Sequence, residues 1–306
     1  MATVQPSHPD NWKWRNDKSL SKLDASHRKA GWWAVDTNNP NSWQTGGSAY
    51  MAESTADVIL TQEVKIAEGY PQEAAEQAAR TAKWKVSIEP CLITAAGGKS
   101  AGTAVATRSY IGMSTPKAVA TSQHLHPQGH LAIRRVAAMG RGGVHFGSIY
   151  CFSEANEGGI HSESNLGLLK SAAFTINSLV GPWIVGGDWN CTPADLTKTG
   201  WLDKVGGVIH APSSPTCNGK IYDFFVVAKS ISDQVQSTHL IADAGFTPHS
   251  PARLIFRGLP RKTMVRHLNA PSPIPAVLPH GPMQELTEKV DLVEELNRTA
   301  DQTTTT

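Results

Sequence analysis

The sequence has few cysteines, no long apolar run and almost no net charge, and these shortages exclude several classes of protein. Its four cysteines (Cys91, Cys151, Cys191 and Cys217) include no C-x-x-C pair, which argues against a zinc ribbon or a disulfide framework and favours a reducing compartment. No apolar stretch approaches the ~20 residues that a membrane helix needs, and the N-terminus lacks the apolar core of a signal peptide. We therefore expect an intracellular monomer without a membrane partner, with the nucleus as one possible compartment.

Composition divides the chain into three parts. Residues 1–30 are polar and mixed in charge, and residues 257–306 begin with basic residues and continue into a Pro-rich stretch. Between them, the chain is long enough to bury the core of one large domain. The formal net charge of +2 neither requires nor excludes a polyanionic partner. We predict an N-terminal extension over 1–30, a domain over 31–256, and a linker and tail over 257–306.

Within the predicted domain, short apolar runs alternate with segments of helical period. Strands are predicted at 31–36, 57–61, 85–94, 102–108, 131–139, 144–151, 183–185, 221–227 and 252–256. Helices are predicted at 48–55, 71–84 and 164–180. This order predicts an α/β fold, a four-layer α/β sandwich in which two mixed sheets pack face to face with helices outside.

The stretch PWIVGGDWNCTP (182–193) carries the clearest chemical signal. An apolar strand ends at two glycines, and Asp188 and Asn190 follow at once. Reactive groups collect where strands end, because loops there can present polar side chains. A carboxylate can take a proton from water while an amide hydrogen-bonds a phosphate oxygen. A plain Asp/Asn turn explains this stretch equally well when it is taken alone.

Other polar residues also stand at predicted strand ends: Asn39, Asn41, Glu63, Tyr150, Asp223 and His249. Each has a structural explanation, since Glu63 can be a solvated residue after an edge strand and Tyr150 a core aromatic. Asp223 is harder to explain in this way, because an acid inside an apolar strand needs a partner. His249 offers that partner.

Together these motifs resemble the endonuclease/exonuclease/phosphatase superfamily, and they occur in the family's order. The matching motifs are Asn39-Pro40-Asn41, Gln62-Glu63, Ile149-Tyr150, Gly187-Asp188-Trp189-Asn190, Tyr222-Asp223-Phe224 and Pro248-His249. Members of this family cleave phosphoester bonds with a divalent metal.

The resemblance implies a role for each matching residue. Glu63, helped by Asn39 and Asn41 directly or through water, is expected to hold Mg²⁺ or Mn²⁺, which prefer oxygen ligands. Asp188 is expected to deprotonate the attacking water. Phosphate oxygens are expected to contact the side chains Asn190, Tyr150 and His249, the last of these oriented by Asp223.

Two positions depart from the family pattern. Pro248 stands where the family has an acid before its histidine, and Asn41 stands where many members have Asp. Both differences remove a negative charge near the metal. The resemblance therefore predicts weak metal affinity, and it leaves an inactive copy as an alternative.

Within the family, the Gln-Glu-x-Lys motif and the Pro215-Thr216 segment resemble the apurinic/apyrimidinic endonuclease-like branch, which includes endonuclease domains of non-LTR retrotransposons. We therefore predict a DNA endonuclease, with a reverse transcriptase domain of a longer chain as one possible partner. Basic residues that could contact the DNA backbone are Lys65, Arg108, Arg134, Arg135 and Arg141. A small-molecule or phospholipid phosphoesterase and a degenerate nucleic-acid-binding module are the alternatives.

Overall fold

A computed structural model describes residues 19–122, 125–153 and 158–259, which form two six-stranded sheets flanked by helices. The first sheet has the order β13-β14-β1-β2-β6-β3 and the second the order β11-β12-β10-β9-β8-β7. The strands of the first sheet are β13 (Val235–Leu240), β14 (Ala252–Phe256), β1 (Trp33–Asn38), β2 (Val58–Thr61), β6 (Thr103–Arg108) and β3 (Trp84–Glu89). Those of the second are β11 (Gly207–His210), β12 (Asp223–Ala228), β10 (Trp183–Asp188), β9 (Val144–Tyr150), β8 (Leu131–Val136) and β7 (Met113–Ser114). A small hairpin pairs β4 (Leu92–Ile93) with β5 (Lys99–Ser100).

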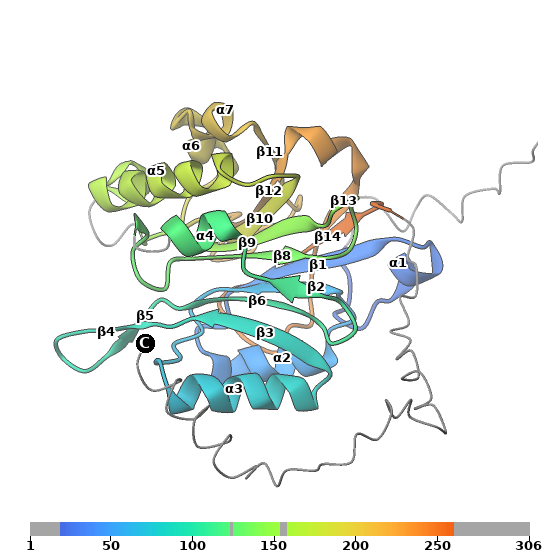
Figure 1. Ribbon diagram of the computed structural model, residues 1–306, viewed down its shortest axis with the longest axis horizontal. Helices are drawn as coiled ribbons and strands as arrows, with labels where there is room; N and C mark the ends of the chain where they lie inside the picture. The colour runs from blue at the N-terminus through green and yellow to red at the C-terminus, as the bar shows by residue number, and fades with distance from the viewer. Residues whose placement is uncertain (1–18, 123–124, 154–157, 260–306) are drawn as a thin grey trace, which may run out of the picture. The chain divides into compact units, whose positions relative to one another are not determined.

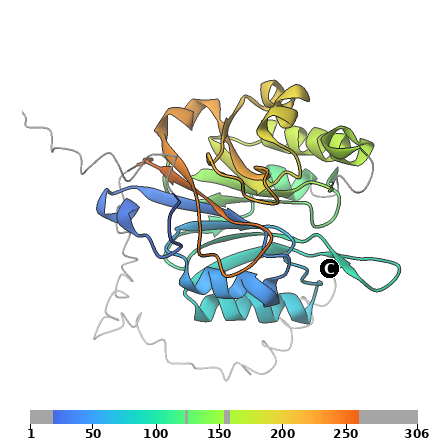
Figure 2. The same ribbon diagram turned by 180° about the vertical axis from the view of Figure 1, so that it is seen from behind.

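The helices cover the outer faces of the two sheets (Figure 1). Those on the first sheet are α2 (Ser48–Glu53) and α3 (Tyr70–Thr81), and those on the second are α4 (Lys117–Ser122), α5 (Glu163–Asn177), α6 (Pro193–Lys198) and α7 (Trp201–Val205). A short helix α1 (Ser26–Lys29) precedes β1. The view from behind shows the same layers (Figure 2). The predicted α/β sandwich with helices outside is thereby confirmed.

Apolar side chains hold the layers together. Val35, Leu60, Phe146 and Phe225 belong to one buried cluster that includes residues of both sheets. A second cluster joins the outer face of the first sheet to α2 and α3. Alternation along each strand explains the division, because successive side chains point to opposite faces.

Strand direction determines which residues meet at each edge of the sandwich. β1 runs parallel to β2, and β9 runs parallel to β10. β14 is antiparallel to β1, and β12 is antiparallel to β10. In the first sheet, the ends of β1 and β2 therefore lie at the same edge as the start of β14. In the second sheet, the ends of β9 and β10 lie at the same edge as the start of β12. We call this the polar edge.

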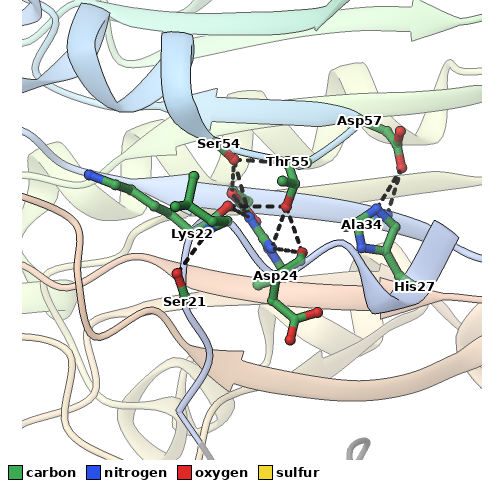
Figure 3. Close-up of polar contacts among 12 residues, drawn as sticks. Ser21, Lys22, Asp24, His27, Ala34, Ser54, Thr55 and Asp57 are labelled. Carbon is green, nitrogen blue, oxygen red and sulfur yellow. Dashed lines mark hydrogen bonds and ion pairs between the residues drawn. The ribbon is translucent and has the colours of Figure 1, made fainter. Parts of the chain in front are cut away.

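The N-terminal prediction needs correction, because residues 19–30 pack on the domain. Leu20 bridges Ile241, and the side chain of His27 is buried. The buried guanidinium of Arg253 donates to the carbonyl oxygens of Lys22 and Asp24 at 3.2 and 2.9 Å. Figure 3 shows Lys22 and Asp24 beside Ser54 and Thr55 in this network. A chain that began at Gly31 would leave Arg253 without these acceptors.

At the other end, the packed part continues slightly past β14. The backbone N–H groups of Arg257 and Leu259 donate to Gln234 and Met139. The remainder of the predicted tail, residues 260–306, lies outside the described residues, as do residues 1–18 of the predicted extension. Within the described ranges, no helix combines the length and apolarity needed to cross a bilayer.

Candidate active site

The polar edge brings together the residues that the sequence singled out. Asn39 and Asn41 follow β1, and Glu63 follows β2. In the second sheet the corresponding residues come from β9 (Tyr150), the end of β10 (Asp188 and Asn190) and the start of β12 (Asp223), while His249 precedes β14. The expected convergence at one edge is therefore present.

A continuous series of polar contacts crosses the site. The Asn39 amide nitrogen lies 3.1 Å from Glu63 Oε2 and 2.9 Å from Asp188 Oδ2, and donates to both. Asp188 Oδ2 lies 3.7 Å from His249 Nε2. His249 Nδ1 lies 2.9 Å from Asp223 Oδ2. This last contact confirms the predicted Asp223–His249 hydrogen bond.

Two carboxyl groups of this series are almost completely buried. Asp188 is 1% exposed and Asp223 is 0% exposed. Burial, and next the charge of Asp223, raise the pKa of Asp188 to about 7, against the lowering effects of His249, Asn39 and the Asn190 backbone. Asp188 can therefore gain and lose a proton near neutral pH, as a general base must.

His249 is the cation of this group. Burial alone would lower its pKa, but the hydrogen bond to Asp223 and the charges of Asp223, Asp188 and Glu63 raise it to about 9. Asp188, Asp223 and His249 have ligand atoms within 4.8 Å of one another, a spacing that could hold a metal. A protonated imidazole has no lone pair for a metal, so a metal at this cluster would have to displace the proton that Asp223 and Asp188 stabilise on His249.

The donors for a metal lie around Glu63. Lys65 Nζ lies 3.6 Å from Glu63 Oε1 and 2.5 Å from Asn41 Oδ1, so both oxygen atoms already face one positive charge. One carboxylate and one amide oxygen directed at a common cation fit a hard divalent ion. The amide of Asn39 is engaged differently, because its oxygen accepts the Asn41 N–H at 2.9 Å. Asn39 thus links Glu63 to Asp188, and its help in holding a metal, directly or through water, stays a prediction.

Tyr150 and Asn190 complete the site from the second sheet. Burial, and then the charges of the nearby Glu63 and Asp188, raise the pKa of Tyr150. The Asn190 amide donates to Cys151 O at 2.6 Å, which fixes its orientation. Both side chains are only partly buried and can therefore contact a substrate.

The backbone of these loops is held in a costly conformation. Asn41, Glu63, Lys65 and Asn190 all have positive φ angles of 60°, 48°, 52° and 47°. Non-glycine residues are uncommon in this region, and such strain is concentrated at functional sites. The clustering supports a functional role for the polar edge.

Three further residues support the site, and sequence reasoning did not assign them a role. The Thr216 hydroxyl accepts the N–H groups of Tyr222 and Asp223 at 2.9 Å each, which fixes the start of β12. His130 stacks on Tyr150 and Phe152 with ring centroids 5.5 and 4.0 Å away. Trp189 is buried against Phe224, so its neighbours Asp188 and Asn190 are held at the strand end. The Pro-Thr segment was the one available signal, for Thr216.

Of the predicted nucleic-acid contacts, Lys65 lies at the site and the four arginines lie elsewhere. Arg108 ends β6, which runs antiparallel to β2, so it lies at the opposite edge over the ring of Trp84. Arg135 pairs with His145 near the start of β9, and Arg141 lies in the following turn, again away from the site. Arg134 is buried and bonds Glu89 at 2.7 Å.

Comparisons with known proteins agree with this geometry. A sequence model described as the Endonuclease/Exonuclease/phosphatase family matches residues 46–253. No curated protein sequence matches the chain.

Solved structures share the fold at low identity. The chain is similar to the endonuclease domain of TRAS1, a telomere-specific non-LTR retrotransposon, with 13% identity, TM-score 0.54, and 74% of this chain and 98% of that one covered. It is also similar to the AP endonuclease LMAP from Leishmania major, with 12% identity, TM-score 0.54, and 84% and 97% covered. The 3'-5' exonuclease NExo from Neisseria meningitidis has 15% identity and TM-score 0.52, with 73% and 99% covered. At these identities the likeness concerns the fold alone.

Proposed function

Because the chain belongs to the endonuclease/exonuclease/phosphatase family, we propose that it is a divalent-metal-dependent phosphodiesterase, and specifically a DNA endonuclease of retroelement type. The observation that carries this proposal is the series of contacts from Glu63 through Asn39, Asp188 and His249 to Asp223. In this series, the carboxylate proposed to bind the metal lies beside the proposed base, whose pKa is near neutral, and beside the histidine proposed as the cation.

In the proposed reaction, Asp188 removes a proton from water, and the resulting hydroxide attacks the phosphorus. The bond between phosphorus and the leaving oxygen breaks, and that oxygen takes a proton from solvent. Its pKa of about 7 matches this task. Protonated His249 donates a hydrogen bond from Nε2 to a phosphate oxygen, while Nδ1 stays bonded to Asp223. The Asn190 amide provides a second polar contact to the phosphate.

Glu63 and Asn41 would hold Mg²⁺ or Mn²⁺, and the ion would offset the charge that develops on the phosphate. Glu63 is the one carboxylate of this donor set. We therefore expect activity to saturate only at high metal concentration and to favour Mn²⁺, which binds such sites more tightly than Mg²⁺.

DNA is the proposed substrate, and a reverse transcriptase domain in a longer chain is the proposed partner. The support comes from the Gln-Glu-x-Lys motif and from the fold likeness to a retrotransposon endonuclease domain. Lys65 is the basic residue placed to contact a backbone phosphate next to the metal.

A second candidate function is a nucleic-acid-binding module without catalysis. The observation that favours it is the Lys65 ammonium, which contacts the oxygen atoms expected to bind the metal. In that case the lysine would replace the metal as the permanent cation, and DNA would bind without being cut.

Incubation with supercoiled plasmid and Mg²⁺ or Mn²⁺ tests the proposal. Conversion of the plasmid to its nicked form supports the endonuclease. Release of phosphate from inositol phosphates without nicking identifies a phosphatase, and binding without cleavage identifies the module. Either of the last two results would overturn the proposed function.

A matched pair of variants connects the activity to the site. Glu63→Gln should abolish nicking without unfolding the protein, because it removes the metal's carboxylate. Glu68→Gln makes the same change at an exposed position of the adjoining loop and should leave nicking unchanged. Activity that survives Glu63→Gln would contradict the assigned metal site.

A further inference from the structure

Directly beneath the active site, the packing between the two sheets changes from apolar to polar. On β1, β2 and β9, the core residues Val35, Leu60 and Phe146 are followed two positions later by Thr37, Gln62 and Ser148. Since side chains two apart share a face of a strand, these polar residues continue the inward-facing rows. All three have an exposed fraction of 0%.

Hydrogen bonds join these side chains across the gap between the sheets. The Gln62 amide nitrogen lies 2.9 Å from Ser148 Oγ, 3.2 Å from Thr37 Oγ1 and 3.2 Å from Leu60 O. Ser148 Oγ in turn donates to Thr61 O at 2.9 Å. The first and last of these bonds connect β2 of the first sheet with β9 of the second.

The active site is divided between the same two sheets. Gln62 is joined by a peptide bond to Glu63, and Thr37 precedes Asn39 by two residues. Ser148 precedes Tyr150 by two residues and pairs with Gly186 of β10, the strand that ends at Asp188. The two sheets meet through apolar contacts, which are non-directional and do not by themselves fix the position of one sheet relative to the other. Hydrogen bonds in a dry interior have strict geometry and do fix it.

We propose that Gln62 and Ser148 are positioning residues. Their hydrogen bond keeps Glu63 and Asn39 of the first sheet close enough to Asp188 of the second sheet for the site to function. This inference rests on the proposed phosphodiesterase function. Neither side chain touches the substrate, so both act through Glu63, Asn39 and Asp188.

Kinetic measurements test the proposal through Gln62→Met and Ser148→Ala. A small misplacement of reacting groups can cost about 10²-fold in rate, so each variant should lower kcat by roughly 10–100-fold. KM should change little, since the phosphate contacts themselves remain. The double variant should lose clearly less than the product of the two single losses, because both changes break the Gln62–Ser148 bond. Ser148→Thr keeps the hydroxyl and should retain most of the activity.

Thr107→Val is the matched control. Thr107 is buried on β6 at the opposite edge, and among the described residues its hydroxyl has no hydrogen-bond partner. This variant removes a buried hydroxyl without breaking a bond between the sheets, so kcat should be unchanged. Equal losses in Thr107→Val and Ser148→Ala, or losses that add up in the double variant, would overturn the proposal.

Crystal structures of Gln62→Met and Thr107→Val give a reading that does not depend on activity. The Asn39–Asp188 distance of 2.9 Å should exceed the hydrogen-bond limit of about 3.5 Å in the first variant and stay unchanged in the second. An unchanged distance in Gln62→Met would overturn the positioning role. An inactive parent protein would overturn the proposed function alone, and the structures would still decide the inference.

Discussion

Two buried ionic clusters differ in how completely their polar atoms are paired: one joins β1 and β14 of the first sheet, and the other lies at the polar edge, where its two carboxyl groups come from β10 and β12 of the second sheet. The anchor cluster consists of Asp36 and Arg253 with the groups that bond them. Arg253 donates to both carboxylate oxygens of Asp36, at 2.7 and 2.8 Å, and Tyr50 and Ser54 donate to the same carboxylate. The catalytic cluster consists of Asp188, Asp223 and His249, and among the described residues Asp223 Oδ1 has no hydrogen-bond partner.

Complete pairing fits a structural role, whereas an unpaired carboxylate oxygen beside a second buried carboxyl group fits a functional one. A buried charge is costly unless it is paired and hydrogen-bonded, and the anchor cluster satisfies this requirement with protein groups alone. The catalytic cluster places two carboxyl groups beside one histidine and raises the pKa of Asp188 to about 7. Perturbed groups of this kind are concentrated at functional sites.

The largest expected effect is a loss of activity when the catalytic cluster is changed. Asp188→Asn keeps the size of the side chain and removes the base, so we expect kcat to fall by roughly 10²–10⁴-fold. The melting temperature should hold or rise, because the repulsion between Asp188 and Asp223 is removed. Rate and thermal unfolding are measured on the same sample. Undiminished turnover would show that another group activates the water.

The second prediction concerns stability. Arg253→Met leaves the carboxylate of Asp36 buried without its cation, which should lower the free energy of unfolding by about 3–5 kcal/mol. Urea denaturation measures this loss. Turnover per folded molecule should match the parent, since Arg253 lies away from the site. A change below about 1 kcal/mol would mean that the anchor cluster does not hold the fold.

A third prediction concerns pH. The proposed mechanism requires ionised Asp188 and protonated His249, so the metal-free pKa values predict activity that rises through pH about 7 and falls through about 9. A bound metal lowers the pKa of Asp188 and moves the acidic limb to lower pH. Asp223→Asn removes a negative charge next to both groups, so both limbs should move to lower pH at fixed metal concentration. If neither limb of the pH profile moves in Asp223→Asn, the charge of Asp223 does not influence the groups whose titration limits the activity.

The smallest expected effect concerns the metal. Asn41→Asp adds a carboxylate beside Glu63 and should lower the half-saturating Mn²⁺ concentration by about tenfold, or ~1.4 kcal/mol. Asn177→Asp adds the same charge at the exposed end of α5 and should leave that concentration unchanged. Equal metal requirements in the parent and Asn41→Asp would contradict the view that the missing acid weakens the site.

The sequence predicted the catalytic cluster better than the anchor cluster, for physical reasons. Asp188, Asp223 and His249 belong to short motifs at strand ends, and strand ends follow from local apolar runs. The anchor cluster depends on the carbonyl oxygens of Lys22 and Asp24, and a backbone carbonyl has no sequence signature. The predicted extension over 1–30 was therefore wrong for residues 19–30.

The positions of the candidate arginines could not be predicted, because residue type does not specify location. Arg108 could be assigned to an edge only once β6 was known to run antiparallel to β2. The predicted strand boundaries differ less from the structure. The one strand predicted over 85–94 is two strands, β3, which ends at Glu89, and the short β4. β11 and β13 were missed because both are only partly buried and carry polar residues among the apolar ones.

The most direct test of the incompletely paired cluster is the titration of His249 by NMR in the metal-free protein, which requires no knowledge of the substrate. Comparison with His249→Gln assigns its resonance among the twelve histidines. Because Asp223 and Asp188 stabilise the imidazolium, the midpoint should lie near pH 9. A midpoint at or below the ordinary value of about 6.5 would contradict the charged cluster on which the mechanism depends.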